Sequence, residues 1–352
     1  MTKTITLPGL IDAHVHLRDP GQTHKEDLLS GTTAALTGGF TTVLDMPNNA
    51  EPVTTIARLK EKIKLAKEKA VCDIGFYYGS LGDNLDTFDE AAQHAVGLKL
   101  YLNKTQGDFL LDAKHLKKIY KAWPKEKPAL LHVEEDLIDV AIESIKDIKR
   151  PVHVCHMPSR EILQKIIKAK QAGLPVTCGV CPHHLFLTSQ HADKLGPYGK
   201  MLPSLKAQSD QDYLWQHLDD IDIFESDHAP HTREEKETMF SPGVPGLETM
   251  LPLLLTAEKQ GKITREQIID KCFAAPARIF NVPTNKDTSV EVSMEEYVIK
   301  NEELHTKCGW SPFAGQKVIG KVKQVTLRGK IVYNNGKVLA RAGNGKVIQG
   351  GK

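Results

Sequence analysis

The chain has 352 residues, of which 40% are hydrophobic and 26% are charged, a composition typical of a folded globular protein. Its formal net charge is only +2 and its lysines are spread along expected helix surfaces, which argues against nucleic acid as a partner. No apolar run approaches the ~20 residues of a membrane-spanning helix, no signal-peptide pattern is present, and the six cysteines follow no disulfide framework, so we expect a cytoplasmic protein outside the membrane.

Strand-like and helix-like segments alternate through the first two thirds of the chain. We expect strands at residues 7–13, 40–46, 72–78, 97–102, 128–133, 151–156, 175–181 and 221–226. Helical periodicity marks residues 26–38, 54–69, 85–95, 112–121, 135–147, 159–172 and 208–218. Continuously apolar strands that alternate with helices predict a (β/α)8 TIM barrel, an α/β fold. The competing architecture is an open, doubly wound sheet, which usually offers one ligand crevice, whereas here polar residues end several strands.

The pattern changes after residue 231. Helical segments are expected at 247–259 and 264–274, followed by strands at 288–292, 318–327 and 330–338, with a hairpin turn at Asn335-Gly336. We therefore expect a metal-dependent barrel domain over residues 1–285. Residues 286–341 would supply C-terminal strands that complete a small β subdomain, and the Gly-rich residues 342–352 would form a flexible tail.

The predicted strand ends carry side chains that bind metals. His14 and His16 lie two residues apart, which puts them on the same side of the first strand. His132, His156 and Asp227 end three later strands, and the carboxyl ends of barrel strands meet at one face. An isolated His-x-His pair is as often structural. The additional imidazoles and the carboxylate favour a transition-metal site.

Lys99 lies within the apolar fourth strand. The ordinary explanation for such a lysine is a stem that extends to water. In an apolar barrel mouth, however, desolvation disfavours the charged ammonium and makes a neutral amine available. A neutral amine can add carbon dioxide and give a carbamate that bridges two divalent ions as a carboxylate would.

Six short motifs, at residues 8–18, 45–48, 97–103, 182–185, 226–232 and 245–249, extend this pattern over nearly the whole chain. Together they resemble the dihydroorotases of the cyclic amidohydrolase superfamily, and most closely the dihydroorotase domains of CAD-type multifunctional pyrimidine-synthesis proteins. The resemblance implies a TIM-barrel hydrolase. Its reaction would be the reversible, zinc-dependent interconversion of dihydroorotate and N-carbamoyl-L-aspartate in de novo pyrimidine biosynthesis.

The resemblance also implies a centre with two Zn²⁺ ions. Its ligands would be His14, His16, Lys99, His132, His156 and Asp227. The first two histidines and the aspartate would bind one zinc, the other two histidines would bind the second, and carboxylated Lys99 (N6-carboxylysine) and a hydroxide would bridge them. Asp227 would also be catalytic, because it would carry the hydroxide proton to the leaving ring nitrogen.

The substrate carries a carboxylate, which calls for several hydrogen-bond donors. By the resemblance these are Arg18, Asn48 and His231, and Arg18 follows His16 by two residues. The loop at residues 103–109 would close over the substrate, with Thr105 as its contact. For Arg18 and for the loop, a simple surface role is the alternative.

Three positions depart from the family pattern. Gly179 replaces a glutamate that, together with the cysteine of strand six, can hold a third zinc, which argues against a third metal at Cys155. Gln106 replaces an aromatic loop residue. Leu202 replaces an arginine or asparagine that helps to bind substrate, and losing one charge-assisted contact costs about 1.5–3 kcal/mol.

Cys178 and Cys181 form a single Cys-x-x-Cys pair. Without a second pair a zinc ribbon is not expected, and packing in the barrel explains both residues better.

Two other functions stay open. One is a related cyclic-amide hydrolase, such as a hydantoinase or allantoinase, although Arg18 and Asn48 favour a substrate that bears a carboxylate. The other is a weakly active or inactive dihydroorotase-like scaffold domain, which only Leu202 and Gln106 support. The resemblance further implies a homodimer, and it leaves open fusion to, or assembly with, carbamoyl phosphate synthetase and aspartate transcarbamoylase.

Overall fold

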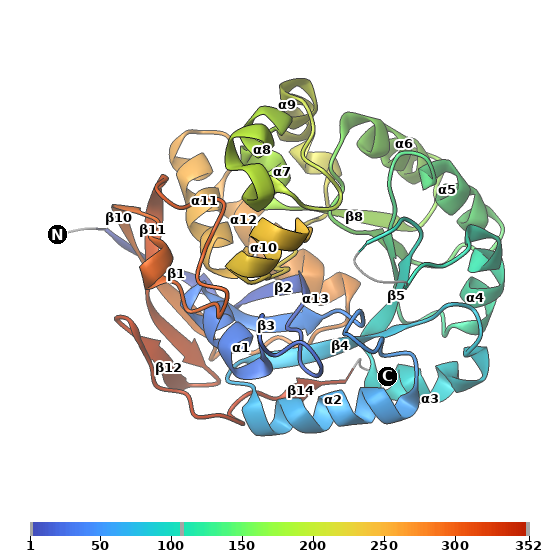
Figure 1. The fold of residues 1–352 in the computed structure, drawn as a ribbon, viewed down its shortest axis with the longest axis horizontal. Helices are drawn as coiled ribbons and strands as arrows, with labels where there is room; N and C mark the ends of the chain where they lie inside the picture. Colours follow the sequence, from blue (N-terminus) through green and yellow to red (C-terminus); the bar gives the residue numbers. More distant parts are fainter. Residues whose placement is uncertain (1–2, 106–108, 350–352) are drawn as a thin grey trace.

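Eight parallel strands form a nearly closed barrel in the computed structural model, which describes residues 3–105 and 109–349 (Figure 1). The strands are β2 (Leu10–Val15), β3 (Phe40–Asp45), β4 (Asp73–Gly79), β5 (Gly97–Tyr101), β6 (Ala129–His132), β7 (Val152–Val154), β8 (Val176–Val180) and β9 (Ile223–Phe224). Each strand pairs with the next in chain order, and a parallel bridge between Val15 and His228 joins the last strand to the first. The predicted TIM barrel is confirmed.

Helices surround the barrel, and every helical segment expected from the sequence is present. They are α1 (Leu28–Thr37), α2 (Ile56–Lys69), α3 (Phe88–His94), α4 (Leu116–Ala122), α5 (Ile138–Lys146), α6 (Arg160–Gln171), α9 (Gln208–Gln216), α11 (Leu247–Lys259), α12 (Arg265–Ile269) and α13 (Ala275–Ile279), with a π-helical turn at Asp270–Ala274. Among the described residues, four short helices were not expected, namely α7 (Pro182–Phe186), α8 (Ser189–Leu195), α10 (Arg233–Met239) and the α13 given above. A helix of five to seven residues is too short to reveal a helical period.

A second, antiparallel sheet draws strands from both ends of the chain. Its strands, in spatial order, are β1 (Thr4–Pro8), β10 (Ser289–Val298), β11 (Lys317–Leu327), β12 (Lys330–Asn334) and β13 (Lys337–Val338). The single strand expected at 7–13 is thus two strands, because Gly9 lets the backbone pass against Thr41 and Thr288, whose side chains a Cβ would overlap. The domain boundary at residue 285 stays a prediction. β1, at the start of the predicted barrel domain, pairs with β10 of the smaller sheet.

The expectation of a flexible tail at residues 342–352 is wrong for the described part, which ends at residue 349. Val347 and Ile348 form β14, which pairs in parallel with β4. Gly345 allows the backbone to approach β4 closely, since a Cβ at this position would overlap the carbonyl of Cys72.

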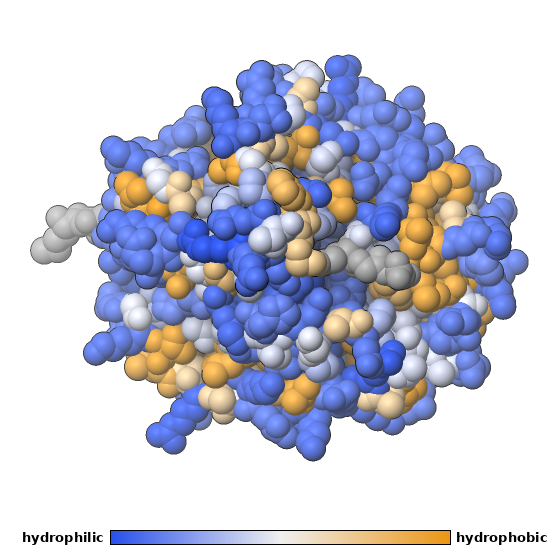
Figure 2. All heavy atoms as spheres, viewed as in Figure 1, coloured by the Kyte–Doolittle hydropathy of each residue, from blue (hydrophilic) through white to orange (hydrophobic). Residues whose placement is uncertain are grey.

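The larger apolar cluster joins the barrel strands to the helices around them. A smaller cluster includes Ile11, Tyr77 and Phe280. Figure 2 shows one face of the molecule, where atoms of hydrophobic residues form several separate patches among hydrophilic ones, with a larger patch on the right of the view. Among the described residues, no helix has the length and apolar character needed to cross a membrane.

Candidate active site

The six side chains expected to bind metal converge at one rim of the barrel. Each of the six is at most 8% exposed, and five of them, all except Lys99, line one pocket. They are His14 and the following His16 at the end of β2, Lys99 in β5, His132 at the end of β6, His156 beyond β7 and Asp227 beyond β9. The arrangement follows from the parallel barrel, in which all the strands end at the same face.

The first cluster joins His14, His16 and Asp227. The Oδ1 atom of Asp227 lies 3.3 Å from Nε2 of His14 and 3.0 Å from Nε2 of His16. On its other side, His16 Nδ1 lies 2.7 Å from the Asn48 amide oxygen, to which it donates. The Nε2 lone pair of His16 therefore faces the carboxylate, and only a proton or a cation between them makes this contact favourable.

Burial sets the charge of this cluster. It raises the pKa of Asp227 to about 7 and holds the pKa values of His14 and His16 well below their usual range, helped for His14 by the Lys99 ammonium and for His16 by Arg18. The imidazoles are therefore neutral at pH 7, which is the form that binds metals.

The second cluster joins His132 and His156, whose facing ring nitrogens are 3.0 Å apart. The remaining nitrogens, Nε2 of His132 and Nδ1 of His156, are buried and make no hydrogen bond among the described residues, although Glu134 Oε1 lies 3.7 Å from Nε2 of His132. Leaving such a group unpaired costs about 1–3 kcal/mol. These orphaned nitrogens fit a site that receives cations.

Lys99 is fully buried, and its Nζ donates to Sγ of Cys155 at 3.0 Å. In the described part of the chain, no carboxylate lies within 4.0 Å of this Nζ. This Nζ also lies 5.0 Å from the centre of the Tyr101 ring. A buried ammonium without a carboxylate partner is costly, and a carboxylated Lys99 would avoid this cost.

Three of the four expected substrate contacts, Arg18, Asn48 and Thr105, line the same pocket, as does Leu202. His231 lies behind Arg18 instead, with its Nε2 3.3 Å from a guanidinium nitrogen, while Arg18 Nε donates to the Pro230 carbonyl. Burial and the nearby cations hold the pKa of His231 far below its usual range, so a neutral His231 supports Arg18. Gln106 lies outside the described residues.

Glu225 is a fully buried carboxylate beside the expected metal ligand His14, and the sequence did not reveal its importance. Its Oε2 lies 3.5 Å from Nδ1 of His14, and its Oε1 accepts from the backbone N–H of His156. A Cβ on Gly179 would collide with this carboxylate. Ligand atoms of His14, Cys155 and Glu225 lie within 4.8 Å of one another, so the loss of a glutamate at position 179 does not remove the carboxylate from the surroundings of Cys155.

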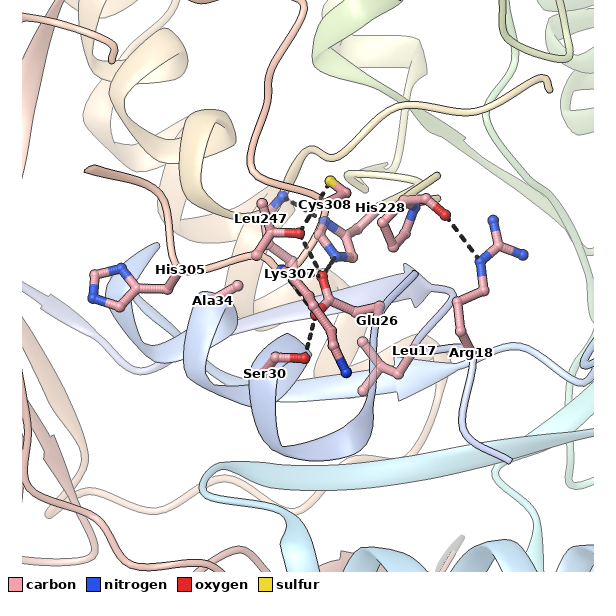
Figure 3. A network of polar contacts seen from close by, with 12 residues as sticks. Leu17, Arg18, Glu26, Ser30, Ala34, His228, Leu247, His305, Lys307 and Cys308 are labelled. Atoms are coloured by element: carbon pink, nitrogen blue, oxygen red, sulfur yellow. Dashed lines mark hydrogen bonds and ion pairs between the residues drawn. The ribbon is translucent and has the colours of Figure 1, made fainter. Parts of the chain in front are cut away.

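A second buried carboxylate, Glu26, lies in a network of polar contacts that includes His228 (Figure 3), the residue that follows Asp227. Glu26 accepts hydrogen bonds from the hydroxyls of Ser30 and Thr306 and from the backbone N–H of Lys307 at 3.1 Å. His228 Nδ1 accepts from the Gly246 N–H, so its Nε2–H, 3.3 Å away, donates to Glu26.

This network braces a strained backbone. Asp227 has a φ of 45°, and His156 and Arg18 also lie in the left-handed region, at 37° and 62°. Such conformations cost about 1–3 kcal/mol each and persist where the surroundings enforce them. Three pocket residues from different strands share this feature, which is typical of a functional site.

Comparisons with known proteins agree with this geometry. The model of the amidohydrolase family matches residues 5–288. Dihydroorotase from Pyrococcus abyssi is 37% identical over 99% of this chain and 88% of its own length. Multifunctional protein CAD from Squalus acanthias is 43% identical over 99% of this chain, which spans only 16% of that protein.

Two solved structures are also similar. L-Hydantoinase from Arthrobacter aurescens matches with a TM-score of 0.92 at 23% identity, covering 98% of this chain and 88% of that one. An inactive dihydroorotase-like domain of a Chaetomium thermophilum CAD-like multifunctional protein matches with a TM-score of 0.85 at 25% identity, covering 98% and 99%. The first likeness bears on the fold alone.

Proposed function

Because this chain belongs to the amidohydrolase family, we propose that it is a dihydroorotase that interconverts dihydroorotate and N-carbamoyl-L-aspartate. The observation that carries the proposal is the position of the buried Arg18 guanidinium, which lines the same pocket as the histidine and aspartate cluster. A cyclic amide that bears a carboxylate would place its charge against Arg18 and its ring carbonyl toward the cluster.

The donor set fits two divalent cations, for which Zn²⁺ is the first choice. His14, His16 and Asp227 would hold one ion, and His132 and His156 the other, with Lys99 between them as N6-carboxylysine. Imidazole and carboxylate ligands suit zinc. When bound, the ions would polarise the amide carbonyl and lower the pKa of a water molecule.

The chain's own residues would then orient the substrate and move one proton. Arg18 and Asn48 would bind the substrate carboxylate, with His231 holding Arg18 in place. Asp227 would take a proton from the attacking water at its carboxylate and deliver it to the leaving ring nitrogen. Glu26 and His228 would keep the Asp227 backbone in position during this transfer.

The setting of the enzyme is part of the same proposal. All six cysteines are free thiols, which suits a cytoplasmic protein. The likeness to a multifunctional protein supports fusion to, or assembly with, carbamoyl phosphate synthetase and aspartate transcarbamoylase. We also propose a homodimer.

The direct test is an assay of the purified, zinc-loaded chain with dihydroorotate, hydantoin and allantoin as separate substrates. We expect turnover of dihydroorotate, and a loss of about 10²–10⁴-fold in Asp227→Asn, as for removal of a proton-transfer group. Lys64→Ala, at an exposed position on α2, is the matched control for Lys99→Ala, which should also be inactive.

Two outcomes would contradict the proposal. Preference for hydantoin or allantoin would favour the related hydrolases, whose fold this chain shares. No turnover of any substrate by the zinc-loaded chain would favour the scaffold function, which the likeness to an inactive domain and the apolar Leu202 in the pocket support.

A further inference from the structure

Cys181 is a fully buried cysteine whose neighbours include two histidines. Cys178, the other member of the Cys-x-x-Cys pair, packs in the cluster between barrel and helices as expected. Cys181 is 0% exposed, yet in the part of the chain that the structure describes it belongs to none of the three hydrophobic clusters. Its neighbours are His183 and His184 of helix α7.

These three side chains present their ligand atoms to one another. One Sγ and two ring nitrogens lie within 4.8 Å of one another, and both histidines are only 3% exposed. A tetrahedral zinc ion with bonds of about 2.0–2.3 Å holds such atoms about 3.3–3.7 Å apart. Inward movements of about 1 Å would therefore complete a three-ligand site.

The hydrogen bonding of His184 leaves one of its two ring nitrogens with a free lone pair. His184 Nε2 lies 3.2 Å from the Pro203 carbonyl, which can only accept, so the proton resides on Nε2. Nδ1 of His184 then carries the lone pair, and it is buried without a partner. A histidine that donates one N–H to a backbone carbonyl and keeps the other nitrogen bare has the arrangement of a metal ligand.

The charge states agree with this. Burial lowers the pKa of His184 to about 4 and holds the pKa of His183 well below its usual range, so both rings are neutral at pH 7. Burial raises the pKa of the Cys181 thiol, which therefore stays protonated until a coordinated cation displaces its proton.

We propose that Cys181, His183 and His184 form a binding site for one divalent cation of the zinc class, made of residues other than the six proposed ligands of the strand ends. A thiolate with two imidazoles suits zinc and cobalt rather than magnesium or calcium. The fourth position would be open to water. His184 donates a hydrogen bond to the carbonyl of Pro203, which follows Leu202 in the chain. The ion would therefore also stabilise the position of Leu202, which lines the pocket.

Cobalt titration of the metal-free full chain tests this site. A thiolate bound to Co²⁺ gives a charge-transfer band in the near ultraviolet, whereas the nitrogen and oxygen ligands of the proposed two-metal centre do not. We expect this band in the unmutated chain. We expect Cys181→Ala to lose the band and one bound equivalent of Co²⁺, and Cys178→Ala, the matched control, to keep both.

Cys155 is a second buried thiol near imidazole and carboxylate groups, so Cys155→Ala is the decisive comparison. A band that survives in Cys181→Ala and disappears in Cys155→Ala would overturn the proposal, as would the absence of any thiolate band in the cobalt-loaded chain. Because the band does not depend on turnover, it can succeed or fail independently of the proposed dihydroorotase activity.

Discussion

Replacing Glu26 with alanine should destabilise the protein strongly. The Glu26 carboxylate is completely buried and receives hydrogen bonds from two hydroxyls, one backbone N–H and the ring of His228. Each donor left unpaired costs about 1–3 kcal/mol, and breaking a buried polar pair from one side costs about 3–5 kcal/mol. Because the four donors relax together, we expect the free energy of unfolding to fall by about 3–5 kcal/mol.

The measurement is urea unfolding of the full chain, followed by the fluorescence of its three tryptophans. Glu61→Ala, at an exposed position on α2, is the control and should change stability by no more than about 0.5 kcal/mol. Glu26→Gln keeps the shape of the side chain and one acceptor, so its loss should be smaller, about 1.5–3 kcal/mol.

A Glu26→Ala protein that unfolds at the same urea concentration as Glu61→Ala would refute this reasoning. It would mean that water replaces the carboxylate without cost. Equal stability but a lower kcat would show instead that Glu26 acts only through the position of Asp227.

Three further predictions concern the pocket. Gly179→Ala should lower the free energy of unfolding by about 1–3 kcal/mol, since its Cβ would overlap the Glu225 carboxylate, and unchanged urea unfolding would contradict the packing described for Glu225. Metal affinity should weaken as the pH falls below about 7, because burial raises the pKa of Asp227 to about 7 and the protonated acid must release its proton to bind a cation. Calorimetry in buffers of different ionisation enthalpy should therefore detect more protons released per metal below pH 7 than above it, and equal release would argue against Asp227 as a ligand. Arg18→Gln should raise the KM for dihydroorotate by roughly ten- to a hundredfold, the equivalent of about 1.5–3 kcal/mol, and an unchanged KM would remove Arg18 from the substrate site.

Local sequence patterns were sufficient for the barrel and for the convergence of its ligands. Period-two spacing placed His14 and His16 on one side, and the rule that parallel strands end at one face brought Asp227 toward them. The patterns failed where contacts are long-range. Glu26 and Lys307 are 281 residues apart, and no local sequence pattern around either residue predicts their hydrogen bond. The glycines near the C-terminus led to the prediction of a flexible tail, whereas Gly345 allows close packing against the backbone of Cys72.

The buried carboxylate of Asp12 links closure of the barrel to formation of the candidate site. The first strand meets the segment that follows the last strand through the Val15–His228 bridge and the hydrogen bond from the His16 N–H to the His228 carbonyl. Asp12 strengthens this seam, because its Oδ1 accepts from the backbone N–H groups of both His14 and Ser226 at 3.1 Å. The first N–H group belongs to His14, whose side chain contacts Asp227, and the second belongs to Ser226, which directly precedes Asp227. Since the Asp12 carboxylate holds His14 close to the residue before Asp227, the distance between these two proposed ligands depends on how the barrel closes as well as on the Glu26 network.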